Sequence, residues 1–169
     1  MKSFLYGSLL LFSLYGCSAS RPPAGSDSKP VISFSPSTCY REPFEKVLFR
    51  ASLDVRKQHL GGFLLIKKTP DSVYRIVFAN EIGMTLFDFG IRDDQFRVNY
   101  VFEAMNRKIL LKLFAKDFTE MIYGVKVRSS NPIMKTELHS TGKEGEVPEK
   151  ITISNPGIKM EMTLTLISQ

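Results

Sequence analysis

From residue 45 onward, apolar and polar residues alternate in short segments, and this period of two is typical of strands with one buried face. Four such segments follow one another closely, joined by short polar turns: residues 60–68, 72–79, 84–91 and 95–102. In the last segment, one face is expected to carry Phe96, Val98, Tyr100 and Phe102. Connections as short as these predict an antiparallel meander.

The remainder of the domain adds further strands and one helix. Other alternating stretches lie at residues 45–55, 134–139, 151–153 and 158–166. Between residues 103 and 122 the apolar residues recur at helical spacing instead, and Gly124 follows where a helix is expected to stop. Counting a short run at 31–34 that could dock at an edge, one amphipathic helix and about nine strands predict a mainly β, α+β domain. Its expected form is an unclosed antiparallel β-barrel, a curved half-barrel wrapped around the central helix.

Residues 1–16 have the composition of a signal peptide. Lys2 precedes an apolar run of about a dozen residues, too short to span a membrane and long enough for a signal-peptide core. The run ends at residues 14–17, Leu-Tyr-Gly-Cys, which resemble the lipobox of bacterial lipoproteins. The resemblance implies that Cys17 becomes the first residue and carries acyl chains that anchor the protein to membrane lipid. The alternative is an ordinary secretory signal with a chance cysteine.

Residues 17–44 lie between this signal and the domain. Their density of serine and proline leaves no helical period, so we expect a flexible tether. Ser18 follows the lipobox cysteine, and in the lipoprotein family it is chiefly Asp at this position that retains a protein in the inner membrane. The resemblance therefore implies an outer-membrane location facing the periplasm, with display on the cell surface as the alternative. Cys39 is left without a cysteine partner in the mature chain, so no internal disulfide is expected.

Charge and motif content narrow the function. The formal net charge of +6 suits an anionic membrane surface or an acidic partner, and it equally suits mere solubility; we expect no nucleic-acid partner. The predicted helix carries cations that form either a headgroup-binding patch or, as the pattern favours, a solvated face: Arg107, Lys108, Lys112 and Lys116. His59 and His139 stand alone, and phosphate loops and nucleophile elbows are missing. We therefore expect no metal site, no cofactor and no enzymatic activity.

The apolar inventory is rich in methionine and phenylalanine, with 7 Met and 13 Phe. Methionine adapts to varied apolar shapes, which suits a binding cavity for acyl chains. The same residues also make a plain core with flexible filler, and composition alone favours that second interpretation.

A resemblance to the LolB family is carried mainly by residues 69–85, which read Thr-Pro-Asp-Ser-Val-Tyr-Arg-Ile-Val-Phe-Ala-Asn-Glu-Ile-Gly-Met-Thr. LolB proteins are outer-membrane receptors that take lipoproteins from the periplasmic carrier LolA. The family has a similar strand with Pro-Asp and Tyr-Arg, followed by aliphatic residues and a turn. Residues 148–153, Pro-Glu-Lys-Ile-Thr-Ile, and the alternating strand after them are similar to the family's ending. The likeness extends over residues 45–169.

The resemblance implies an unclosed barrel with an apolar cavity for acyl chains. It also implies a protruding turn that enters the membrane, and the matching positions are Ile82 and Gly83. Loop tips usually carry Gly, Asn or Asp, so an isoleucine there is explained by insertion into lipid. The alternative is that Ile82 folds back onto the body. Parity and resemblance together give the expected lining of the cavity: Phe63, Leu65, Tyr74, Ile76, Phe78, Leu86, Phe96, Val98, Leu110, Leu113, Phe114, Met160 and Met162.

These features predict an outer-membrane-anchored lipoprotein that binds acyl chains or lipoproteins and assists their insertion into the membrane. Its expected partners are membrane lipid, acylated lipoproteins and a LolA-like carrier. The rival prediction is a structural or interaction lipoprotein that uses the same fold as a scaffold in an envelope complex. A filled interior would favour the scaffold, and so would an Ile82 buried at an interface.

Overall fold

The structure is a computed structural model that describes residues 45–169 apart from residues 94, 125, 128, 130 and 144–145. The predictions made for the signal peptide, Cys17, the tether, the run at 31–34 and Cys39 therefore lie outside the described residues. The strands and helices described below all belong to the domain that begins at residue 45.

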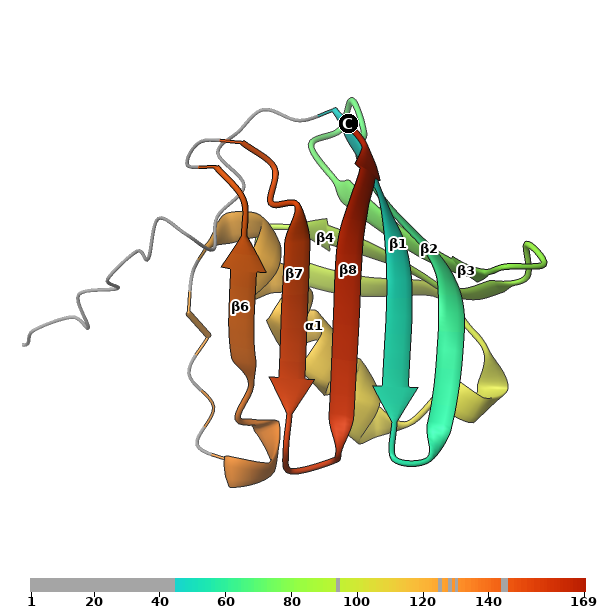
Figure 1. Cartoon of the computed structure of the whole chain (residues 1–169), viewed down its shortest axis with the longest axis vertical. Helices are drawn as coiled ribbons and strands as arrows, with labels where there is room; N and C mark the ends of the chain where they lie inside the picture. Colours follow the sequence, from blue (N-terminus) through green and yellow to red (C-terminus); the bar gives the residue numbers. More distant parts are fainter. Residues whose placement is uncertain (1–44, 94, 125, 128, 130, 144–145) are drawn as a thin grey trace, which may run out of the picture. The chain divides into compact units, whose positions relative to one another are not determined.

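Eight antiparallel strands form one open sheet in the order β5-β4-β3-β2-β1-β8-β7-β6 (Figure 1). Strands β1 to β5 are neighbours in sequence order, as the meander predicts, and β8 returns to pair with β1. The strands are β1 (Lys46–Val55), β2 (Gln58–Lys68), β3 (Tyr74–Asn80), β4 (Thr85–Arg92), β5 (Gln95–Val101), β6 (Glu137–Thr141), β7 (Lys150–Asn155) and β8 (Met160–Ser168). Among these strands, β5 and β6 form the two ends of the sheet and are not paired with each other. The predicted unclosed half-barrel is confirmed.

One helix, α1 (Lys108–Tyr123), lies against the inner face of the curved sheet (Figure 1). It begins five residues later than predicted, because η2 (Glu103–Met105) is a separate 3₁₀ turn and Asn106, at ψ 63°, leaves helical geometry. It ends as predicted: Gly124 adopts a left-handed conformation at φ 65°, and its N–H donates to the carbonyl of Glu120. A second 3₁₀ turn, η3 (Pro132–Met134), includes Met134, where a strand was predicted to start, and β6 begins only at Glu137.

Aromatic rings from α1 and β4 form the centre of the core. The ring of Phe87 lies 5.2 Å from that of Phe114 and 5.8 Å from that of Phe118, measured between centroids. Phe89 stacks on Phe87 at 4.5 Å, and all four rings are fully buried or nearly so. Because burial of each large apolar side chain contributes on the order of 1.5–3 kcal/mol, this cluster holds the helix to the sheet.

The run at residues 63–66, apolar on both faces, is divided between the two sides of the sheet. Leu64 and Ile66 are fully buried in the core beneath α1. Phe63 and Leu65 lie on the outer face and are half-buried there. The guanidinium of Arg50 covers part of the outer face by lying 5.4 Å from the centroid of the Phe63 ring.

The predicted alternation of β5 is wrong beyond Val98. Val98 pairs with Phe89, whereas Tyr100 pairs with Asp88, so Asn99 is an extra residue in a β-bulge. Because Asp88 and Phe89 are adjacent and point to opposite faces, Tyr100 lies on the face opposite to Val98. A bulge depends on the pairing of two strands, and the sequence of β5 alone does not reveal it.

Gly62 should be essential to the pairing of β2 with β3. A Cβ at this position would lie 2.0 Å from the carbonyl oxygen of Ala79 and 2.8 Å from Cα of Asn80, both of which are backbone atoms. We expect Gly62→Ala to lower the free energy of unfolding by more than about 2 kcal/mol, measured by denaturant titration. Gly61→Ala is the matched control, because only side-chain atoms at 3.8 Å or beyond approach its Cβ. Equal stability of the two variants would contradict this interpretation.

Candidate functional site

The β3–β4 turn holds Ile82 away from the rest of the domain. Its side chain is 88% exposed, the largest exposure among the exposed large hydrophobic residues of the described part, and Met84 next to it is 43% exposed. Figure 1 shows this hairpin, in green, projecting beyond the neighbouring strands at the right of the view. The alternative that Ile82 folds back onto the body is therefore wrong.

Asn80 fixes the shape of this turn. Its side-chain Oδ1 accepts a hydrogen bond from the backbone N–H of Met84 (2.8 Å), and its carbonyl accepts one from the N–H of Gly83 (3.0 Å). Gly83 adopts φ +84°, a conformation that favours glycine. With both arms of the turn bonded to Asn80, Ile82 is left at the apex with its side chain in solvent.

Further exposed apolar residues lie where the end of β5 runs beside the start of β4. The N–H of Phe102 donates to the carbonyl of Leu86 (2.7 Å), which fixes the chain after β5 beside β4. Phe102 is 38% exposed and Tyr100, in the same strand end, is 47% exposed. Phe102 and Tyr100 are thus further exposed apolar residues at the end of β5.

Most of the residues predicted to line a cavity lie in the core. These are Tyr74, Ile76, Phe78, Leu86, Leu110, Leu113, Phe114, Met160 and Met162, with Phe96 packed against them. The prediction that Phe63 and Leu65 line the inner face is wrong. The register pairs them with Arg50 and Leu48, which places both on the outer face. Val98 has the inward register of Phe89 but is 40% exposed, since β5 is an edge strand.

Side chains of α1 occupy the inner face onto which these residues project. Phe114 and Phe118 meet the rings of Phe87 and Phe89, and Leu113 is fully buried beside them. The space that the resemblance assigns to acyl chains is therefore filled, in this state, by the helix. Any ligand on this face would have to replace contacts that α1 makes with the sheet.

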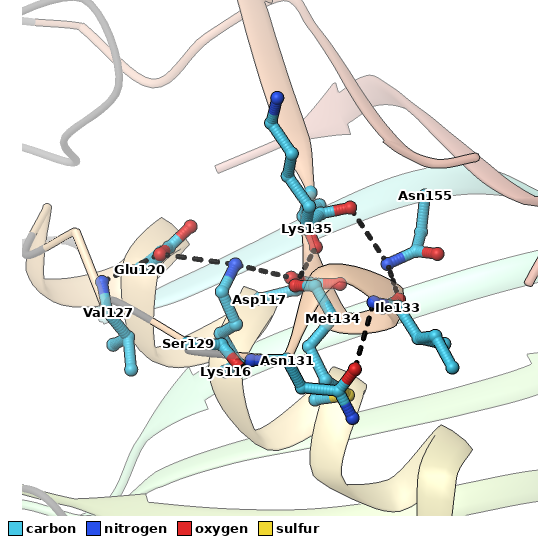
Figure 2. Close-up of polar contacts among 11 residues, drawn as sticks. Lys116, Asp117, Glu120, Val127, Ser129, Asn131, Ile133, Met134, Lys135 and Asn155 are labelled. Atoms are coloured by element: carbon cyan, nitrogen blue, oxygen red, sulfur yellow. Dashed lines mark hydrogen bonds and ion pairs between the residues drawn. The ribbon is translucent and has the colours of Figure 1, made fainter. Parts of the chain in front are cut away.

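A buried group of charged residues lies on the C-terminal half of α1 (Figure 2). The ammonium of Lys116 is 3.6 Å from Oδ1 of Asp117 and 3.3 Å from Oε1 of Glu120, and all three side chains are at most 11% exposed. The sequence pattern favoured a solvated helix face for Lys116, and this prediction is wrong. Glu120 also accepts a hydrogen bond from the N–H of Val127 (2.7 Å), which ties the chain after α1 to the helix.

Asp117 is the most deeply buried member of this group. It is 1% exposed, and neither carboxylate oxygen accepts a hydrogen bond from a described residue. Burial raises its pKa to about 6, while the nearby Thr136 hydroxyl and the charge of Lys116 oppose the shift. That hydroxyl donates at 3.4 Å to the carbonyl of Met134, which leaves the carboxylate poorly compensated.

Asn155 fastens the segment before β6 to the end of β7. Its fully buried amide donates to the carbonyls of Ile133 and Lys135, both at 3.0 Å, and its Oδ1 accepts from the N–H of Ile158 (Figure 2). In the sequence this residue shows only as the start of an Asn-Pro-Gly stretch, which is typical of a turn. Asp117 carries a clearer sequence signal, because this acid lies between Phe114 and Phe118 within the apolar stripe of the helix.

On the outer face, Arg75 and Asn99 hold the carboxylate of Asp88. The Nε of Arg75 donates to Oδ1 at 3.1 Å, and the amide of Asn99 donates to the same oxygen at 3.0 Å. Burial would raise the pKa of Asp88, but these hydrogen bonds and the arginine charge outweigh it and lower the pKa. The bulge at Asn99 is therefore fixed by a polar contact as well as by strand pairing.

In the described part of the chain, no helix is both long and apolar enough to cross a membrane. Nor do three or more His, Cys, Asp or Glu side chains come together there in a way that could hold a metal ion. Comparisons of the sequence with protein-family models and with curated proteins found no match.

Asp117→Asn should change the pH dependence of stability. The folded-state pKa is raised from 3.8 to about 6, so the carboxylate destabilises the fold increasingly as the pH rises through this window. Relative to the parent chain, the asparagine variant should gain up to about 3 kcal/mol in free energy of unfolding between about pH 4 and about pH 8. Denaturant titrations at the two pH values measure this difference. Asp71→Asn, in the exposed β2–β3 turn, is the control, and a pH-independent difference for Asp117→Asn would contradict the assignment.

Proposed function

We propose that this protein is an outer-membrane lipoprotein that binds acyl chains or acylated lipoproteins and assists their insertion into the membrane. The observation that carries the proposal is the exposed Ile82 at the apex of a turn braced by Asn80. An isoleucine held in water gains on the order of 1.5–3 kcal/mol when it enters an apolar phase. At 88% exposure, this side chain contributes little to packing against the described residues.

The acyl-binding surface in this proposal is the interface between α1 and the inner face of the sheet. Its residues are aliphatic, aromatic and methionine side chains, the chemistry that an acyl chain would contact. A bound chain would exchange apolar contacts with the helix for apolar contacts with the ligand, so little hydrophobic free energy would be lost. The connections on either side of α1 would have to let the helix move away from the sheet.

The proposed partners follow from the same arrangement. Cys17 would carry the acyl anchor, which keeps the domain at the membrane into which Ile82 inserts. Cargo would arrive as acylated lipoprotein from a soluble carrier of the LolA kind. The domain would act by binding and release alone, with no catalytic step.

Ile82→Glu should separate binding from delivery. We expect the variant to take up a fluorescent acyl probe as the parent chain does, because Ile82 is remote from the core, and to lose transfer of that probe into vesicles at least about tenfold. The matched control is Ile133→Glu on η3, since Ile133 is also exposed (45%) but lies outside the turn. Unchanged transfer by Ile82→Glu, or equal loss in both variants, would refute a role of Ile82 in delivery to the membrane.

A second candidate function is a scaffold subunit of an envelope complex. The observation that favours it is the filled interior, in which Phe114 and Phe118 already contact the rings of β4. In this case Ile82 would contact a protein partner, and the domain would not bind acyl chains.

Binding of an acyl probe would distinguish the two functions through the helix. If chains bind beneath α1, amide hydrogen exchange should accelerate in Lys108–Tyr123 on addition of the probe, while the β1–β8 pair keeps its protection. Native mass spectrometry of residues 18–169 purified from bacterial cells, with extraction of bound species, is the companion measurement. A protein that is empty and also refuses the probe would leave the scaffold as the remaining candidate.

A further inference from the structure

The register of the sheet aligns basic residues in one row across its outer face. Lys46 of β1 pairs with Lys67 of β2, and Lys67 pairs with Arg75 of β3. Arg75 pairs with Gly90 of β4, which in turn pairs with Arg97 of β5. Paired residues of neighbouring strands point to the same face, so the four basic side chains form a line, here called the cationic row.

The cationic row is exposed and poorly neutralised. Its four side chains are all exposed, and within the described part of the chain the one ion pair that any of them makes joins Arg75 to Asp88. Like charges directly opposite each other destabilise a sheet, whereas opposite charges stabilise it. Two successive like-charged pairs, Lys46 with Lys67 and Lys67 with Arg75, therefore work against the stability of the fold.

Acidic residues gather elsewhere on the same face. Glu137 of β6, Glu161 of β8 and Asp54 of β1 belong to one row, since Ser154 of β7 pairs with both glutamates and Glu161 pairs with Asp54. This acidic row and the cationic row thus lie toward opposite ends of β1, and Asp88, which binds Arg75, is the acid beside the basic row. A face that served only solubility would gain from mixing the two signs.

We propose that the cationic row is an electrostatic docking surface for a bilayer that carries anionic phospholipid headgroups. Its charge complements the headgroup phosphates. Lys67 and Arg97 have long stems that let their charged ends reach a surface. The chain enters β1 through Lys46 itself, so residues 17–44, which carry the predicted anchor, join the domain at this row. Half-buried Leu48, Leu65 and Val77 form the next row on the same face.

This contact goes beyond the proposed insertion of Ile82 and does not depend on it. Arg75 lies near the start of β3 and Ile82 in the turn that follows its end, so the strand from Arg75 to Asn80 alone separates them by about 17 Å. Docking through the row should be weakened by salt and require anionic lipid. Insertion of Ile82 should tolerate salt and neutral lipid.

The test is vesicle binding by the chain from residue 18, which keeps every described strand and lacks the predicted anchor. Vesicles of phosphatidylcholine with about 30 mol% phosphatidylglycerol are compared with pure phosphatidylcholine at low and high salt. The double variant Lys67→Gln/Arg97→Gln should bind the anionic vesicles about 30-fold more weakly at low salt, since each basic group near an anionic surface contributes about fivefold. The control Lys108→Gln/Lys112→Gln removes the same charge from exposed positions on α1, which packs against the opposite face of the sheet, and should lose much less.

The outcomes distinguish docking through the cationic row from membrane insertion of Ile82. Loss confined to the double variant, with Ile82→Glu still bound to anionic vesicles, supports the row. The proposal is overturned if both double variants lose binding equally, or if Lys67→Gln/Arg97→Gln leaves binding unaffected. It is also overturned if the protein binds duplex DNA but not vesicles. The double variant should also unfold at the same temperature as the parent chain or higher, because repulsion is relieved. If the double variant instead unfolds at a lower temperature than the parent chain, the vesicle test is repeated with the single variant Lys67→Gln, whose position is exposed.

Discussion

The packing of α1 against the inner face of an open sheet is the contact on which this domain depends. An unclosed sheet of eight strands cannot bury its own concave side, and one helix supplies the missing layer. The stacked rings of β4 and α1 make that layer continuous. Any function that uses the interior must act through this interface, whereas a function that uses only the surface can leave it untouched.

The architecture was largely readable from the sequence, because alternation and turn chemistry are local properties. The meander, the stop at Gly124 and the unclosed sheet followed from residues close together in the chain. The errors have a different origin. The bulge at Asn99 and the outward placement of Phe63 and Leu65 depend on which residue of one strand faces which residue of the next.

The candidate site was readable in part for the same reason. An isoleucine between turn residues is anomalous in any fold, so Ile82 could be singled out from the sequence. The cationic row could not, because its four members lie far apart in the chain and become neighbours only through the register of four strand pairs. Asp117 lies between these cases. The sequence shows an acid in an apolar helical stripe, but the burial of its carboxylate and the contacts with Lys116 and Thr136 that set its pKa arise only in the folded chain.

The two ends of the sheet have a consequence for contact between identical domains. Unpaired strand edges are templates for pairing with another copy. Here β6 offers only five residues, and β5 is interrupted by a bulge whose extra residue is anchored to Asp88. Neither edge presents a long, regular ladder to a second copy. The bulge that breaks the alternation of β5 thus also protects this edge of the sheet from pairing with another copy.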